Sequence, residues 1–164
     1  MYNEYFESEY GLFLVEASDS FLTKVVIVEK KDEELPKGNK ITAECVTQLA
    51  EYFNLERTTF DLPLYFGESF SHKVLKALYE GKYGETLSYK ELGERIDSRA
   101  YQAIGSAMKN NPLPVIIPCH RVIKNDGSLG NYYYGPKMKK ALLLQEYRYI
   151  FKEALQHERV ISET

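Results

Sequence analysis

Short apolar stretches near the start of the chain have the residue types and spacing of β-strands. Residues 11–17 and 22–28 are rich in β-branched and apolar side chains, and the polar residues 18–20 separate them, as in a β-hairpin. The next segment, residues 29–40, is polar and contains a proline and a glycine, which predicts a loop. We therefore expect the chain to open with a small antiparallel sheet.

Beyond this loop the apolar spacing becomes that of a helix. Apolar residues recur at helical spacing between Ile41 and Phe53, and Cys45 lies on or beside their face, so we expect this cysteine in the core. Residues 60–64 contain a proline and are expected to form an extended link to the rest of the chain.

The second part of the chain has the apolar spacing of helices. The first of them should begin at a serine cap, either Ser69 or Ser71, and two glycines break the chain after it. A capping-box pattern opens the second helix. The expected helices cover residues 70–78, begin at residues 88–91, run from Ala100 to about Lys109, and run from Pro136 or Lys137 past Glu146.

Two of these helices are short and joined by a tight polar turn, and the second is rich in small residues. This arrangement is typical of a helix-turn-helix, although helical hairpins in general are common. The elements together predict an α+β protein with two domains. Residues 1–63 should form a small β-sheet with a helix, and residues 64–164 a mostly helical domain that contains the helix-turn-helix.

Composition is typical of a soluble globular protein. The chain has 164 residues, 44% of them hydrophobic and 27% charged, enough for one ordinary domain or two small ones. No apolar stretch approaches the ~20 residues that span a bilayer, and the first residues lack the basic, apolar opening of a signal peptide. Two cysteines provide no disulfide framework. We expect an intracellular location, cytoplasmic or in a nucleoid or nucleus, and no membrane partner.

Charge is divided unevenly along the sequence. The formal net charge is -3, but residues 1–63 carry 6 Lys and Arg against 13 Asp and Glu, whereas residues 64–164 carry 15 against 11. A mildly basic part beside an acidic part fits a DNA-binding module attached to a scaffold that does not bind DNA. Charge alone does not decide the point, because so small a basic surplus is ordinary.

The most informative segment is residues 118–122, Pro-Cys-His-Arg-Val, which ends an apolar, proline-bounded run that begins at Asn111. The run predicts a strand, and Cys119 emerges from it beside a histidine. A neighbouring base or cation lowers a cysteine pKa and populates the thiolate, which is the reacting species. The segment therefore indicates a nucleophile, and a buried structural cysteine is the alternative.

Together with residues 103–112 and the Gly-Asn-Tyr sequence at 130–132, this segment resembles the O6-alkylguanine-DNA alkyltransferases. The resemblance runs from about Phe70 to Glu146 and is weaker in the N-terminal third. The Pro-Cys-His-Arg-Val core with an upstream Asn-Pro pair is highly specific, and alkyltransferase-like proteins lack the cysteine. The resemblance implies DNA repair without a cofactor: a stoichiometric, irreversible transfer of an alkyl group, mainly methyl, from guanine O6 to Cys119 after base flipping.

The resemblance also implies roles in the reaction. Cys119 would accept the alkyl group, and His120 would act as its base through a water, because adjacent residues in a strand point to opposite faces. Glu146 matches the family glutamate that orients the histidine, and Asn111 would hold the active-site turn by hydrogen bonds to the backbone. Tyr89 matches the tyrosine near the rotated nucleotide, whose hydroxyl can donate to guanine N3.

Other residues would hold the flipped base and the DNA. Tyr132 matches the family tyrosine that walls the pocket, and backbone groups at Cys119, Val122 and Tyr133 would read the edge of the base. Tyr133 and Tyr134 replace smaller residues common in vertebrate members, which should narrow the pocket. The residues expected to contact DNA are Arg99, Ala100, Gln102, Ala103, Gly105 and Arg121, and for Arg121 a structural role is the alternative.

Two departures from the family pattern concern the DNA. Gln102 stands where the family usually has an arginine that fills the space left by the flipped nucleotide. The turn before it is one residue shorter than in the human-type sequence, which leaves Arg99 as a substitute. The expected partner is double-stranded DNA containing O6-alkylguanine, bound by a monomer. Structural zinc has no basis, because the two cysteines and His72, His120 and His157 lack ligand spacing.

Two other classes of function stay open from the residues alone. One is a helix-turn-helix protein that senses damaged DNA or regulates without catalysis, in which Cys119 is structural. The other is a cysteine hydrolase or acyl transferase that uses Cys119 and His120. A hydrolase does not need the helical hairpin, and a pure DNA binder does not need the Pro-Cys-His-Arg-Val segment. The combination therefore favours alkyl transfer.

Overall fold

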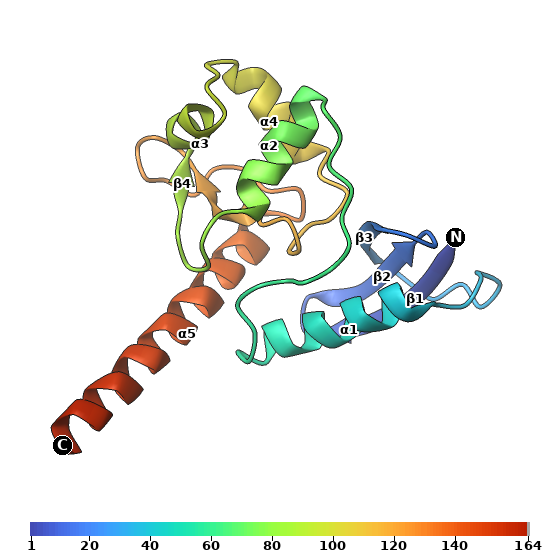
Figure 1. Cartoon of the computed structure of the whole chain (residues 1–164), viewed down its shortest axis with the longest axis horizontal. Coiled ribbons are helices and arrows are strands. Elements are labelled where there is room, and N and C mark those ends of the chain that lie inside the picture. Colours follow the sequence, from blue (N-terminus) through green and yellow to red (C-terminus); the bar gives the residue numbers. More distant parts are fainter. Residues whose placement is uncertain (164) are drawn as a thin grey trace.

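The computed structural model describes the backbone of residues 1–163 and the side chains of residues 1–156. A sheet with one helix forms the N-terminal part, and four helices dominate the rest (Figure 1). The predicted α+β class is confirmed, whereas the division into domains at residue 63 stays a prediction. Within the described residues, no helix combines the length and the apolar character needed to cross a membrane.

Three antiparallel strands in the order β1-β2-β3 make the N-terminal sheet. They are β1 (Tyr2–Ser8), β2 (Gly11–Ala17) and β3 (Leu22–Val28). The predicted hairpin is the β2-β3 pair. The sequence pattern does not reveal β1, because this edge strand is largely polar and only Asn3 within it is buried. Its pairing with β2, from Tyr2 opposite Ala17 to Ser8 opposite Gly11, makes it a strand.

Helix α1 (Lys40–Phe53) packs against this sheet (Figure 1). It begins at the last residue of the predicted loop, because Asn39 caps it: the Asn39 side chain accepts from the Thr42 N–H, and the Thr42 hydroxyl accepts from the Asn39 N–H. Cys45 is fully buried in the core, as predicted, and burial raises its pKa to about 12. Cys45 is therefore a poor nucleophile.

The helical part contains α2 (Phe70–Tyr79), α3 (Tyr89–Arg95), α4 (Tyr101–Lys109) and α5 (Pro136–Glu163). The predicted caps are present: Ser69 accepts from the third residue of α2, and Ser88 closes a capping box with Glu91 at the start of α3. A two-residue parallel pair, β4 (Leu87–Ser88) with β5 (Val122–Ile123), ties the start of α3 to the segment that follows Cys119.

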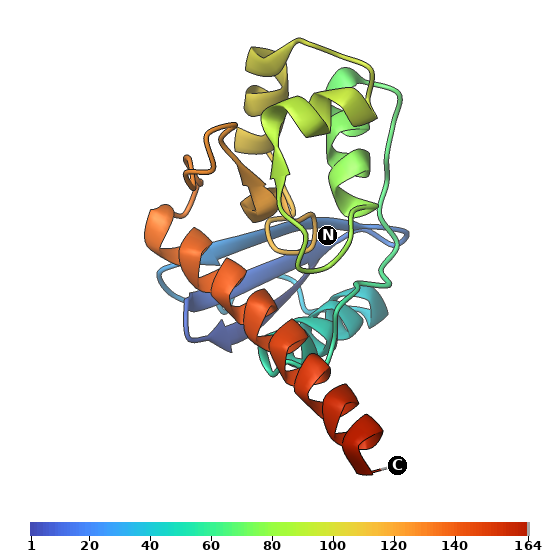
Figure 2. The ribbon, with the colours of Figure 1, turned by 90° about the vertical axis from the view of Figure 1, so that its left-hand side faces the viewer.

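The helices α3 and α4 form the predicted helical hairpin, and α2 packs against α4. Helix α5 leaves this unit and passes in front of the sheet and α1 in the view of Figure 2. Its contact with α1 is direct, because Gln145 Nε2 donates to the Tyr52 carbonyl at 3.0 Å in the buried interior. The first turns of α5 therefore lie between the two parts of the chain.

Candidate active site

The segment that leads to Cys119 is irregular, so the prediction of a strand is wrong. Residues 112–118 contain only an isolated bridge between Pro114 and Ile117. Three prolines remove N–H donors that a strand ladder needs, and Val115 has a φ of 73°, a left-handed conformation that β-branched residues rarely adopt. Residues 119–121 then form one turn of 3-10 helix, which presents the cysteine.

The side chain of Asn111 stabilises this turn by hydrogen bonds. Its Nδ2 donates to the Ile117 carbonyl at 2.9 Å and to Cys119 Sγ at 3.3 Å, and its Oδ1 accepts from the Leu113 N–H at 2.9 Å. Burial raises the pKa of the Cys119 thiol, while the Asn111 hydrogen bond and the charge of Lys139 act in the opposite direction. The resting cysteine is therefore a thiol that needs a base.

Behind the nucleophile, the buried carboxylate of Glu146 accepts four hydrogen bonds. Its Oε2 accepts from His120 Nε2 and from the Tyr52 hydroxyl, both at 2.6 Å. Its Oε1 accepts from Arg121 Nε at 2.8 Å and from the Gly84 N–H at 3.1 Å. Burial raises the pKa of Glu146, but these donors, His120 first, outweigh it and hold the pKa at about 2. Glu146 is thus ionised in the folded protein.

His120 is fully buried, and burial lowers its pKa in spite of the Glu146 contact, so its imidazole is neutral. Because Nε2 donates to Glu146, Nδ1 carries the lone pair, and Nδ1 has no partner among the described protein atoms. No direct hydrogen bond joins His120 to Cys119 in the described part of the chain. The predicted reason, opposite faces of a strand, is wrong: the 3-10 turn separates the two side chains.

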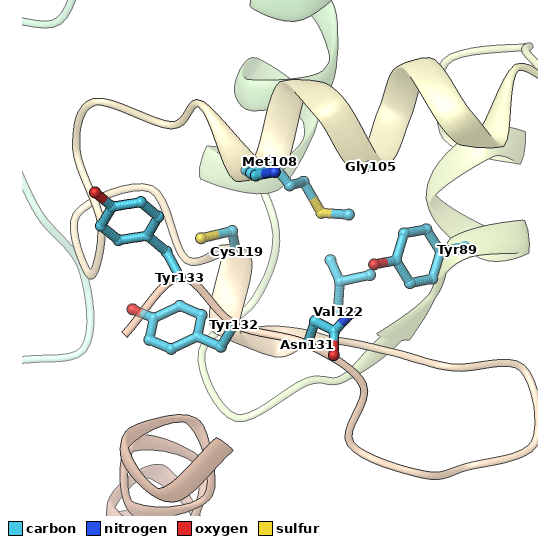
Figure 3. A pocket seen from close by; sticks show the side chains of 9 residues that line it. Tyr89, Gly105, Met108, Cys119, Val122, Asn131, Tyr132 and Tyr133 are labelled. Atoms are coloured by element: carbon cyan, nitrogen blue, oxygen red, sulfur yellow. The ribbon is translucent and has the colours of Figure 1, made fainter. Parts of the chain in front are cut away.

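Cys119 lies on the wall of a cavity of about 440 Å³ (Figure 3). In Figure 3, Cys119 sits between Met108 and Tyr132, and the Tyr89 hydroxyl points toward Val122 from the far side. The cavity joins the nucleophile turn, the helix-turn-helix and the loop before α5. Its lining residues are Tyr89, Gly105, Met108, Lys109, Cys119, Val122, Asn131, Tyr132 and Tyr133.

Tyr134, predicted to narrow the pocket, is absent from this wall. Its hydroxyl accepts from the Ile27 N–H at 3.2 Å, and its ring packs edge-on against Tyr133 at 4.8 Å. Its ring also packs edge-on against Tyr132 at 6.2 Å, so Tyr134 supports the wall from behind and ties the loop before α5 to β3, and its effect on the width of the pocket stays a prediction. Tyr133 does line the cavity and is 70% exposed, so its ring has room to move.

Arg121, predicted to contact DNA, is buried. Its Nε donates to Glu146 Oε1 at 2.8 Å, and its guanidinium lies 5.5 Å from the centre of the Tyr83 ring. This cation neutralises a buried carboxylate, so the arrangement fits the structural role that was the alternative for Arg121 and not a DNA contact. The other predicted DNA residues, Arg99, Ala100, Gln102 and Ala103, are exposed at the start of α4, while Gly105 faces the cavity. Their role stays a prediction.

Lys139 is a site residue that the sequence reasoning missed. It is 1% exposed, and its Nζ donates to the Val122 carbonyl and, at 3.2 Å, to the Asn131 carbonyl. Its charge also lowers the pKa of Cys119. A signal was available: Lys139 is three and seven residues before Leu142 and Glu146, so a lysine stands on the buried face of α5.

No group of three or more His, Cys, Asp or Glu side chains that could hold a metal occurs among the described residues. His157, which we considered with the other histidines, lies outside the residues whose side chains the structure describes.

The buried histidine and glutamate predict how stability depends on pH. Folding lowers the pKa of His120, so the unfolded chain protonates first and stability should fall as pH drops below 6.5. Folding lowers the pKa of Glu146 from 4.5 to about 2, so further stability should be lost over that interval. The free energy of unfolding is measured with denaturant across this pH range. The loss of stability between pH 4.5 and about 2 should be absent in Glu146→Gln and present in the exposed variant Glu7→Gln. An identical acid profile in both variants would contradict this assignment.

A thiol held by an asparagine, backed by a buried histidine and carboxylate and opening onto a cavity beside a helix-turn-helix, defines a protein that brings cysteine chemistry to DNA. Comparison with known proteins agrees. Residues 69–148 match the family model of the 6-O-methylguanine DNA methyltransferase DNA binding domain. Residues 1–66 match the ribonuclease-like domain of the same proteins. The chain belongs to the methylated-DNA–protein-cysteine methyltransferase family, also called the O6-methylguanine DNA methyltransferases.

Individual relatives are similar over most of the chain. The methylated-DNA–protein-cysteine methyltransferase of Methanosarcina barkeri is 40% identical over 153 residues, which cover 89% of this chain and 97% of that protein. The protein of the same name from Mycolicibacterium paratuberculosis is 37% identical, over 87% and 90% of the two chains. The crystal structure of Mycobacterium tuberculosis OGT in complex with DNA has a TM-score of 0.80 and 34% identity, over 91% and 94%.

Proposed function

We propose that this chain repairs O6-methylguanine in duplex DNA by moving the methyl group to Sγ of Cys119, once per molecule. The observation that carries the proposal is the place of Cys119: it stands on the wall of a cavity beside α4, with Asn111 on its sulfur and the His120–Glu146 pair behind it. A structural cysteine needs neither the cavity nor the buried histidine–carboxylate pair.

The geometry supports a balanced sequence of steps. His120 Nδ1 takes the thiol proton through a bridging water, and the ionised Glu146 stabilises the resulting imidazolium. The thiolate attacks the methyl carbon, a carbon–sulfur bond forms, and the carbon–oxygen bond breaks with its electron pair left on guanine. The Tyr89 hydroxyl donates a hydrogen bond to the departing guanine anion, which takes up a proton from water, while the imidazolium returns the thiol proton to water. The thioether has no route back to the thiol, so each molecule acts once and no cofactor is needed.

The cavity accounts for access to the base. An O6-methyl group cannot be reached inside a stacked duplex, so the nucleotide must rotate out of the helix. The Tyr132 and Tyr133 rings and the small Gly105 of α4 provide the walls for a flat base next to Cys119 (Figure 3). The exposed start of α4, with Arg99 and Gln102, would contact the DNA around the vacated position. The repair itself needs one chain, and we propose that it takes place inside the cell on a monomer.

A titration tests this function. Increasing amounts of protein are added to a fixed amount of O6-methylguanine duplex, and the remaining lesion is counted after the reaction stops. We expect one lesion lost per chain and none with Cys119→Ser, while Cys45→Ser retains full capacity. Loss of several lesions per chain would indicate a turning-over hydrolase, and tight binding without loss would indicate a sensor.

DNA binding should depend on charges at α4 and not on those of the sheet. Arg99→Glu is expected to weaken binding to undamaged duplex and to reduce the slope of log K against log salt by roughly 0.9, the value for one phosphate contact. Lys24→Glu, on the exposed edge of β3, makes the same charge change and should leave both quantities unaltered. Fluorescence anisotropy at several salt concentrations measures them. Equal weakening by both variants would show that only net charge matters.

A further inference from the structure

Tyr52 belongs to the sheet-and-helix part of the chain, yet its hydroxyl lies in the active-site network. It sits in the last turn of α1 and is fully buried. The hydroxyl donates to Glu146 Oε2 at 2.6 Å, the same oxygen that accepts from His120 Nε2 at 2.6 Å. Two donors therefore share one carboxylate oxygen, one from each part of the chain.

The surroundings of Tyr52 hold this hydroxyl in place. Gln145 Nε2 donates to the Tyr52 carbonyl at 3.0 Å, and Gln145 is the neighbour of Glu146 in α5. The Tyr52 ring packs against Phe60 at 5.3 Å and edge-on against Tyr83 at 6.2 Å. Since the ring is packed on several sides and the backbone is tied to α5, the phenol has one available position.

The chemistry of the contact gives it an effect on His120. Burial and the nearby Glu146 charge raise the pKa of Tyr52, so the phenol stays protonated and acts as a donor. A hydrogen bond to an ionised oxygen is charge-assisted and draws negative charge from that oxygen. The phenol therefore competes with the imidazole for Oε2. As a result, Glu146 stabilises the protonated form of His120 less, and the His120 pKa is lower than it would be without the phenol.

Other charged or titratable groups around the pair act in known directions. Arg121, on the same turn as His120, pairs with Oε1, and its charge and that of Lys139 on α5 both lower the pKa of His120. Tyr83, Cys119 and Tyr132, whose ring packs edge-on against His120 at 6.5 Å, are further titratable neighbours, and none of them donates a hydrogen bond to Glu146 in the described structure. Tyr52 is thus the neutral side chain that shares Oε2 of this carboxylate with His120.

We propose that Tyr52 is a positioning residue for methyl transfer: from the N-terminal part of the chain it fixes the Glu146 carboxylate and keeps His120 neutral before the reaction. The inference rests on the proposed function and deepens it. It gives the sheet and α1 a part in the chemistry, because their packing decides where the phenol stands.

The test combines a titration of His120 with a rate. Tyr52→Phe keeps the ring and removes only the donor. By NMR of the His120 imidazole in unreacted protein, we expect its pKa to rise by roughly half a unit or more, because Oε2 then serves His120 alone. Methyl transfer near neutral pH should nevertheless slow about tenfold, the effect of one hydrogen bond to a charged group, because the carboxylate is no longer fixed beside His120 and this loss of position outweighs the gain in basicity.

Tyr79→Phe is the matched control. It also removes a phenol hydrogen bond, here to the Phe60 carbonyl, but Tyr79 does not touch Glu146. We expect Tyr79→Phe to change the denaturant midpoint about as much as Tyr52→Phe does, but to leave the His120 titration unchanged. Incorporation of 3-fluorotyrosine at position 52 strengthens the donor with little change in size, and it should lower the His120 pKa.

The titration needs no alkylated DNA, so it separates this inference from the proposed function. Wild-type protein that fails to accept methyl, with the expected His120 shifts intact, would refute only the function. An unchanged His120 titration in Tyr52→Phe and in the fluorotyrosine protein would overturn the role of Tyr52. A slower reaction with no shift would also overturn it, because a merely structural contact predicts that result.

Discussion

Glu146→Gln should slow methyl transfer by about 10²- to 10⁴-fold, the range that general acid–base catalysis contributes. In the wild-type protein four donors point at the two carboxylate oxygens of Glu146. The carboxamide has only one acceptor oxygen, so its NH₂ group would face two of these donors. The imidazolium that forms when His120 takes the Cys119 proton would lose its counter-charge. Single-turnover kinetics with O6-methylguanine duplex measure the loss.

The same change should destabilise the fold by about 3 to 5 kcal/mol, because Arg121 becomes an unpaired buried charge. Glu153→Gln, exposed on the same helix, is the control and should alter neither the rate nor the denaturant midpoint. A Glu146→Gln protein that stays fully folded and transfers methyl at the wild-type rate would show that the carboxylate is neither a structural nor a catalytic partner.

Lys139→Met is expected to have the second large effect, a loss of stability and of Cys119 thiolate. The methionine matches the length of the lysine stem but removes the ammonium, so the Val122 and Asn131 carbonyls both lose a buried donor. Each unsatisfied group costs about 1 to 3 kcal/mol, and both belong to cavity-lining residues. The Cys119 thiolate also loses a nearby cation, so its pKa should rise and the pH profile of its alkylation by iodoacetamide should move to higher pH.

The neighbouring Lys140 is exposed, and Lys140→Met is the matched control for charge. It should leave the iodoacetamide profile and the transfer rate unchanged. If Lys139→Met and Lys140→Met behaved alike, the ammonium of Lys139 would have no special place in the site, and the Val122 and Asn131 contacts would be incidental.

Local features of the fold could be predicted because the residues that determine them are close in sequence. The β2-β3 hairpin follows from two apolar runs and a polar turn, and the serine caps at Ser69 and Ser88 follow from side chains that accept from the N–H three residues on. Strand β1 could not be predicted in this way. It is an edge strand whose residues are mostly half exposed, so partnership with β2, and not an apolar face, specifies it.

The same distinction divides the site. The Pro-Cys-His-Arg-Val segment identifies Cys119 and His120 because these two reactive residues are adjacent in the sequence. Contacts across long stretches of chain leave no local pattern: Tyr52 meets Glu146 across 94 residues, and Tyr134 meets Ile27 across 107. The role of Arg121 stayed open between structure and DNA for the same reason, since its buried partner Glu146 lies 25 residues further along the chain.

The central claim, that Cys119 receives the methyl group, is tested most directly by intact-protein mass spectrometry after incubation with O6-methylguanine duplex. We predict that the mass of every active chain increases by one methyl group, that proteolytic mapping assigns it to the peptide containing Cys119, and that Cys119→Ser shows no increase. A methyl group on the buried Cys45, or repaired DNA with no change in the mass of the protein, would contradict the account.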